Sequence, residues 1–371
     1  MSKKSGALAR YVTTAIAIVG CLLSAGCRAG YFVRLGYEQA RFLARARSIE
    51  AELKASDDAQ RRGRLQIVLD LREFASRNGL DTGGSYLAVS EIEPGSGVQV
   101  VTAAFRERLE AWTWNYPVVG RLPYRGYFDR DAASDYAERL RSRGLDTRVV
   151  AAAAYSTLGW FDDPLPSPVL ELDEVSMVTV ILHELVHSTL FVSGQIDFNE
   201  SLATAVSMRL AAAFFEERGE GEKAGEVGRR RVLWVQRGRA YRRLEERLID
   251  WFRACAEKRC SEEELLTGRS AIYEESKRSM ASRGLLGRIG GQASGRSSDL
   301  APMDNAWFLA VYRYHRAVDD FEAWLDGYQN TAAALEALEQ RVAGGEPFSE
   351  LEALVHELGR LVALRWKRGC G

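Results

Sequence analysis

His183-Glu184-Leu185-Val186-His187 lies within Met177 to Val192, a run in which most of the remaining residues are apolar. A segment of this length that is apolar nearly all round predicts a buried helix. On a helix the two histidines stand four residues apart, so their imidazoles project from one face and can share one metal ion. Glu184 lies on the same turn, where it can serve as a general base beside the metal rather than as a ligand.

The surroundings of this motif favour a metal over a coincidence of residue types. The chain has only four histidines, and two of them stand at this spacing with a glutamate after the first. In a helix that is otherwise apolar, three polar side chains would be buried and would need partners. One Zn²⁺ ion would satisfy them, so we expect zinc to be bound through His183 and His187.

A catalytic zinc ion usually has three protein ligands, and Glu200 is the best candidate for the third. An unbroken helix from His187 would carry Glu200 about 20 Å away, so the chain must reverse in between. Gly194 is suited to the left-handed conformation that ends a helix, and Asp197 or Asn199 can cap the next helix. Glu200 would then face back from the first turn of that helix. Asp197 is the competing ligand.

The first 26 residues have the organisation of a secretory signal peptide. Lys3, Lys4 and Arg10 supply positive charge ahead of Tyr11 to Leu23, an apolar run too short to span a membrane comfortably. Small residues follow and end in Cys27. This pattern predicts cleavage before Cys27 and attachment of lipid to its thiol.

Cys21 also follows a lipobox-like pattern, but cleavage there would truncate the apolar run to about eight residues, so we prefer Cys27. Lipidation at Cys27 predicts a bacterial cell-envelope protein that is anchored to the membrane by lipid. Arg28 is not the aspartate that tends to retain lipoproteins in the inner membrane, so we expect the periplasmic side of the outer membrane. In such an oxidising compartment Cys255 and Cys260 can pair if the helix breaks between them.

The balance of acidic and basic residues limits which classes of binding partner are expected. Among 371 residues 50 are basic and 51 are acidic, which gives a net charge of −1. A protein that mainly binds nucleic acid needs a basic surface, so nucleic acid is not expected as a partner. The hydrophobic share of 46% is enough for a sizeable core.

Several motifs together resemble the bacterial family called putative aminopeptidases. They are the lipobox, Pro123-Tyr124-Arg125-Gly126-Tyr127-Phe128, Ala154-Tyr155-Ser156-Thr157-Leu158-Gly159-Trp160-Phe161, the HExxH motif and Phe198-Asn199-Glu200-Ser201-Leu202-Ala203. The likeness runs from the lipobox to Asn305-Ala306. It implies a zinc metallopeptidase with peptide substrates. The Asn-Glu-x-x-Ala element is shared with gluzincin aminopeptidases, in which the glutamate is the third zinc ligand.

Two features of those aminopeptidases differ here. The spacing between His187 and Glu200 is shorter, and the sequence has no Gly-x-Met-Glu-Asn element, which in many of them recognises the substrate's amino terminus.

Hydrophobic periodicity predicts an α+β fold, mostly helical, with a small antiparallel sheet. The resemblance to the metallopeptidase family implies that this sheet and the active-site helix form a zincin-like core. Strands are expected at 97–103 and 147–157, and one continuous helix is expected at 305–328. The expected organisation is a signal peptide at 1–26, an N-terminal helical region at 27–110, and a metallopeptidase region with a helical C-terminal part at 111–371.

The oxyanion that develops during peptide hydrolysis needs a donor besides the metal. We take Tyr312 as the catalytic candidate, with Tyr314, His315 and Tyr155 as alternatives. Each of these rings could equally be a packing residue.

Tyr155 and Arg125 are the candidate substrate-binding residues. Residues 149–157 could form an edge strand that pairs with an extended peptide. Arg125 could bind a substrate carboxylate, although an arginine of this kind can also serve only the structure.

Two classes of function remain in view. The first is an envelope zinc peptidase. The second is a non-catalytic lipoprotein that binds a peptide or protein partner, for which the charged helix at 229–256 could serve as an arm. A pure binding site would not need a base, so Glu184 favours the enzyme.

Overall fold

A computed structural model describes residues 27–92, 98–116, 120–151, 163–286, 302–343 and 345–357. The chain forms two compact units, Met1–Ala46 and Arg47–Gly371. The described part of the first unit is essentially helix α2 (Cys27–Ala44). The predicted signal peptide, Cys21 and Tyr155 lie outside the described residues. In the described part of the chain, no helix combines the length and the apolar character needed to cross a membrane.

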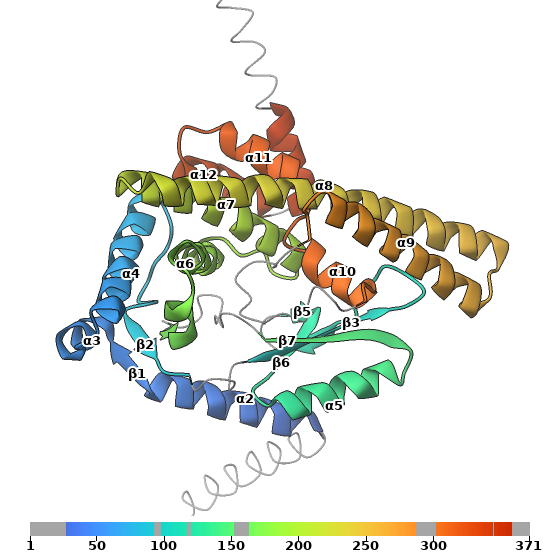
Figure 1. The fold of residues 1–371 in the computed structure, drawn as a ribbon, viewed down its shortest axis with the longest axis horizontal. Coiled ribbons are helices and arrows are strands. Elements are labelled where there is room, and N and C mark those ends of the chain that lie inside the picture. The colour runs from blue at the N-terminus through green and yellow to red at the C-terminus, as the bar shows by residue number, and fades with distance from the viewer. Residues whose placement is uncertain are drawn as a thin grey trace, which may run out of the picture. The chain divides into compact units, whose positions relative to one another are not determined.

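The second unit is mostly helical and has small sheets, which agrees with the predicted α+β class (Figure 1). Its strands are β1 (Ala46–Ser48, which begins at the boundary), β2 (Ala88–Ser90), β3 (Gln99–Phe105), β4 (Trp114–Tyr116), β5 (Gly120–Leu122), β6 (Tyr124–Tyr127), β7 (Leu145–Ala151) and β8 (Leu165–Pro166). Its helices are α3 (Ile49–Ala55), α4 (Ala59–Arg77), α5 (Arg130–Arg141), the 3₁₀ turn η1 (Ser167–Glu171), α6 (Glu174–Thr189), α7 (Ile196–Glu217), α8 (Gly221–Lys258), α9 (Glu262–Ser282), α10 (Asn305–Tyr312), α11 (Val318–Asp326) and α12 (Thr331–Val342).

The sheet β6-β3-β7 is antiparallel and has two differently used faces. Residues that are paired across strands share a face, so Tyr124, Thr102 and Arg148 lie together. Arg125 and Val101, one position along, lie on the opposite face. That opposite face packs against α5, while α10 lies against β3 and β7. Because β3 precedes residue 110 and pairs with strands after it, this sheet spans two of the regions expected from the sequence.

Helices α6 and α7 form the centre of the main core and lie side by side. The Asp173 side chain caps α6 by accepting a hydrogen bond from the Ser176 amide at 2.9 Å. As the sequence predicts, the chain reverses at Gly194, whose φ of +78° suits glycine. Asn199 does not cap α7, which begins at Ile196.

Helices α8 and α9 form a long antiparallel hairpin (Figure 1). Helix α8 has 38 residues and ends at Lys258; the next residue, Arg259, caps it in the left-handed conformation. A disulfide joins Cys255 to Cys260 across this end. Ser261 and Glu264 then form a capping box that starts α9.

The expected continuous helix at 305–328 is wrong, because the chain breaks between α10 and α11. The Ser201 hydroxyl, on α7, donates a hydrogen bond to the Arg313 carbonyl at 2.7 Å and accepts one from the Arg316 amide at 3.0 Å. These two backbone groups therefore do not form the hydrogen bonds that would continue the α-helix. Ala317 then adopts a positive φ of +49° before α11 begins. Residues 313–316 therefore lie at the surface of α7, close to Glu200.

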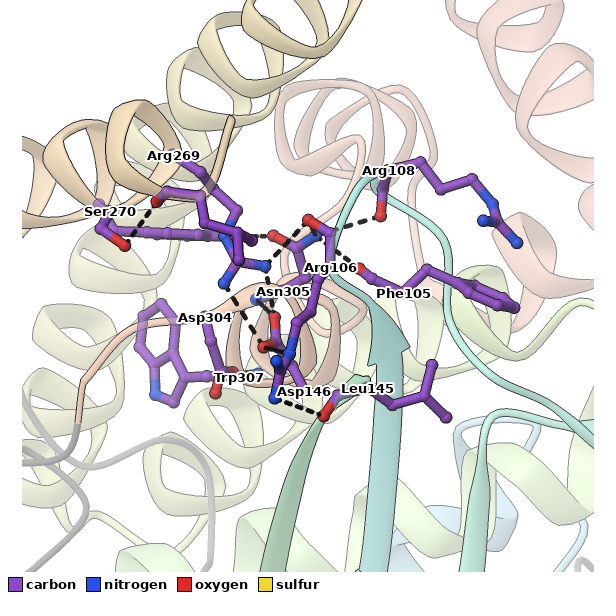
Figure 2. A network of polar contacts seen from close by, with 12 residues as sticks. Phe105, Arg106, Arg108, Leu145, Asp146, Arg269, Ser270, Asp304, Asn305 and Trp307 are labelled. Atoms are coloured by element: carbon purple, nitrogen blue, oxygen red, sulfur yellow. Dashed lines mark hydrogen bonds and ion pairs between the residues drawn. The ribbon is translucent and has the colours of Figure 1, made fainter. Parts of the chain in front are cut away.

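A buried polar network holds α10 to the sheet and to α9 (Figure 2). The Asn305 side chain donates hydrogen bonds to the carbonyls of Phe105 at 2.8 Å and Arg108 at 3.1 Å. Its own oxygen accepts a hydrogen bond from the Tyr273 hydroxyl at 2.7 Å. Asp146, on β7, accepts hydrogen bonds from the Asn305 amide at 3.1 Å and from the Arg269 guanidinium at 2.6 Å. The network fixes where α10 begins.

Asn305→Ala should lower the free energy of unfolding by about 3 kcal/mol or more, because buried carbonyls and a hydroxyl would lose their partners. Chemical denaturation of both proteins measures this difference. Asn115→Ala, at an exposed position on β4, is the control and should cost less than about 0.5 kcal/mol. Equal losses in the two variants would show that the network does not support the fold.

Candidate metal centre

His183, His187 and Glu200 converge on one point between α6 and α7. The Nε2 atom of His183 lies 3.1 Å from Oε2 of Glu200 and 3.2 Å from Nε2 of His187. The third pair, His187 Nε2 and Glu200 Oε2, is 3.7 Å apart. Among the described residues, this is the group of histidine, cysteine and acidic side chains that could hold a metal ion.

These spacings fit a tetrahedral ion. Metal–ligand bonds of about 2.1 Å at tetrahedral angles place ligand atoms about 3.4 Å apart. Two imidazole nitrogens and one carboxylate oxygen are donors of the kind that zinc takes in catalytic sites. Asp197, the competing ligand, instead forms an ion pair with Arg316 at 3.0 Å. The geometry thus favours Glu200.

His187 is buried, His183 and Glu200 are half-buried, and the three side chains interact closely with one another. Burial alone would raise the pKa of Glu200, but the nearby histidines outweigh burial and hold that pKa far below its usual range. Burial alone would lower the pKa of His187, but Glu200 raises it. Glu200 is therefore ionised at any ordinary pH, which is the state that binds a cation.

Glu184 lies on the same helix beside this group and does not join it. Burial raises the pKa of its carboxyl above the usual value, while the two histidines oppose that shift. A raised pKa is suited to a group that must take up a proton and release it near neutral pH.

Tyr86 and Asp163 are neighbours of Glu184 that sequence reasoning missed. Both interact electrostatically with the Glu184 carboxyl, and the Tyr86 amide donates a hydrogen bond to the Asp163 carbonyl at 2.8 Å. Tyr86 is buried and has a φ of +60°, a strained conformation for an aromatic residue. No local pattern in the sequence marks either residue, because they come from segments far from the HExxH motif.

Tyr312 and Tyr314 have different surroundings in the structure. The Tyr312 hydroxyl donates a hydrogen bond to Glu245 at 2.9 Å, and its ring stacks on Phe308. The Tyr314 ring lies 6.1 Å from that of His183. Burial, and next the charge of Glu200, raise the pKa of Tyr314 well above its usual value, so its hydroxyl stays protonated. Of the two tyrosines, Tyr314 is the one beside the candidate metal ligands.

The structure bears on only one of the two predicted substrate-binding residues. Arg125 lies on the α5 face of the sheet, with its guanidinium 5.0 Å from the centre of the Tyr136 ring. This placement favours a structural role. Tyr155 is outside the described residues, so its role stays a prediction. Among the described strands, β7 stands at one end of the order β6-β3-β7, as an edge strand would.

His315 is a packing residue rather than part of the metal group. Its ring is buried 5.1 Å from the Tyr241 ring, and its Nδ1–H donates a hydrogen bond to the Val311 carbonyl at 3.0 Å. Burial is the main cause that lowers the pKa of His315 to about 4. The ring is therefore neutral at physiological pH.

The pKa of His315 predicts how stability depends on pH. The unfolded chain binds a proton below about pH 6.5 and the folded protein only below about pH 4, so folding loses stability as pH falls through this window. Between pH 7 and pH 4 the loss from this group should be about 3 kcal/mol. His315→Gln should lose less stability over that range, as measured by denaturation at several pH values. His356→Gln, at an exposed histidine, is the control, and an identical pH dependence in all three proteins would contradict the assignment.

The chain matches the model of one protein family, described as "Putative aminopeptidase", over residues 30–346. No curated protein and no solved structure gives a significant match. The matched range holds all three metal-centre side chains, Glu184 and the Asn305 network. Since the family model covers most of the sequence, the protein belongs to the putative aminopeptidase family.

Proposed function

We propose that the protein is a zinc-dependent peptide hydrolase of the bacterial cell envelope, with a zincin-like catalytic core. The observation that carries this proposal is the convergence of His183, His187 and Glu200, with Glu184 beside them on the same helix. The family description supports peptidase activity and makes aminopeptidase action the first specificity to test.

His183, His187 and Glu200 would hold the zinc ion through two nitrogens and one oxygen. Zinc bound there would supply Lewis-acid polarisation of a peptide carbonyl and would lower the pKa of water. The Glu184 carboxylate would accept the proton of the attacking water and pass it to the leaving amine nitrogen. The protonated Tyr314 hydroxyl is our candidate donor to the developing oxyanion, in place of Tyr312.

The envelope location rests on the predicted signal sequence and on one structural observation. Cys255 and Cys260 form a disulfide, and such bonds persist in oxidising compartments. A lipid on Cys27 would tether the catalytic unit to a membrane while leaving the hydrolase itself outside the bilayer.

A non-catalytic lipoprotein that binds a peptide or protein partner is the alternative, and the α8–α9 hairpin is the observation that favours it. A paired, charge-bearing hairpin of this length could present a surface to a partner. The raised pKa of Glu184 favours the enzyme instead, because a binding site has no use for a poised base.

A matched pair of variants separates the base from the ligands. Glu184→Gln should keep about one equivalent of zinc and lose roughly 10²–10⁴-fold in turnover, because glutamine keeps the shape but cannot take a proton. His187→Ala should lose both zinc and turnover. Metal analysis of the purified proteins and a peptide-library assay measure the two effects. Unchanged turnover in Glu184→Gln, or full zinc content in His187→Ala, would contradict the proposal.

Labelling with radioactive palmitate should mark the wild-type protein and not Cys27→Ser, because the small residues that follow the apolar run end in that cysteine. Cys21→Ser is the control and should remain labelled. Label that depends on Cys21, or no label on the wild type, would remove the basis for the anchor at Cys27.

A further inference from the structure

We propose that Arg313 binds a carboxylate of the substrate, so that the site prefers peptides that carry an acidic group near the scissile bond. The group is either the free C-terminus of a short peptide or an acidic side chain. This inference rests on the proposed peptidase function and assigns its substrate class.

Arg313 is buried, with 5% of its surface exposed. Its Nε atom makes one long hydrogen bond of 3.4 Å to the Leu309 carbonyl, one turn earlier on α10. Its guanidinium carbon lies 5.8 Å from the centre of the Tyr124 ring. Among the residues that the structure describes, no carboxylate forms an ion pair with this guanidinium, and its two terminal nitrogens have no acceptor.

Other arginines in the same region are neutralised. Arg316, three positions along, pairs with Asp197 at 3.0 Å and Glu245 at 3.4 Å. Arg269, which is equally buried, pairs with Asp146 at 2.6 Å. A buried cation without an anion is unfavourable by several kcal/mol. A bound anion would therefore neutralise the charge of Arg313 and supply the missing hydrogen-bond acceptors.

The position of Arg313 connects it with the metal centre. It directly precedes Tyr314, whose ring lies beside His183. Tyr124, under the guanidinium, also interacts electrostatically with Tyr314. The Tyr124 face of the sheet is the one turned away from α5 and toward α10. Arg313, Tyr124 and Tyr314 thus form one cluster next to the metal ligands.

The chemistry of the guanidinium points to a carboxylate as the bound anion. A planar guanidinium with two free terminal nitrogens matches a carboxylate, which it can hold through two parallel hydrogen bonds.

Three peptides separate the possible sources of the carboxylate: Ala-Ala-Ala with a free C-terminus, its C-terminal amide, and Ala-Glu-Ala amide. On zinc-loaded wild-type enzyme, one or both carboxylate peptides should have a kcat/KM roughly 10- to 100-fold above that of Ala-Ala-Ala amide, as expected for hydrogen bonds between charged groups. Which peptide gains identifies the source as a C-terminus or a side chain. Equal values for all three peptides would overturn the proposal.

Arg313→Gln should abolish this preference while changing the kcat/KM for Ala-Ala-Ala amide only a few-fold. Arg316→Gln is the matched control, because its guanidinium is already paired, and it should keep the preference. Arg313→Lys retains the charge and should keep part of it. If Arg313→Gln slows all three peptides equally, the guanidinium acts on the reacting carbonyl and the proposal is wrong.

Binding supplies a readout that does not need turnover. Calorimetry on the zinc-loaded Glu184→Gln protein should show the same preference for carboxylate peptides, and adding Arg313→Gln should remove it. If wild-type enzyme cleaves no peptide but this binding preference holds, the peptidase function fails while the role of Arg313 stands. If peptides are cleaved and bound without regard to the carboxylate, the role of Arg313 fails alone.

Discussion

Two hydrogen bonds between the Asn199 side chain and Val192 hold the geometry on which the candidate metal centre depends. The side-chain oxygen accepts from the Val192 amide at 2.9 Å, and the side-chain nitrogen donates to the Val192 carbonyl at 2.8 Å. They bind the start of α7 to the segment that leaves α6. Because Glu200 is the next residue, closing this loop sets its distance from His183 and His187. An asparagine is suited to the task because its amide offers both a donor and an acceptor.

The second constraint is the interruption of the chain after α10. The Ser201 hydroxyl, on the helix that carries Glu200, takes the backbone groups that would have continued the helix. One short segment thereby brings Arg313 and Tyr314 to the centre. At the other end of α10, Asn305 anchors the helix to β3 and β7 through buried hydrogen bonds (Figure 2). Glu200 and Tyr314, from two distant parts of the sequence, are thus held beside His183 on α6.

Burial sets the chemistry of the groups so placed. Without the histidines Glu200 would resist ionisation, and with them it is an anion at any ordinary pH. Glu184, on the same helix, keeps a raised pKa. Tyr314 keeps its proton. The pKa of Glu200 is thus lowered while those of Glu184 and Tyr314 are raised, because each group meets different neighbours, and these directions match the roles of ligand, base and hydrogen-bond donor that we propose.

The sequence alone determined the local features. Spacing of four on a helix pairs His183 with His187, glycine at 194 permits the reversal, and periodicity predicts the α+β class, because each depends only on residues a few positions apart. Three conclusions required the tertiary structure. They are the choice of Tyr314 over Tyr312, the placement of Arg125 on the α5 face, and the lack of an ion-pair partner for Arg313 among the described residues. A sequence cannot show which tyrosine hydroxyl forms a hydrogen bond with Glu245. Nor can it show that Ser201 interrupts a helix more than a hundred residues away. Such contacts arise only when distant segments pack together, and here that packing decides which side chains lie beside the candidate metal centre.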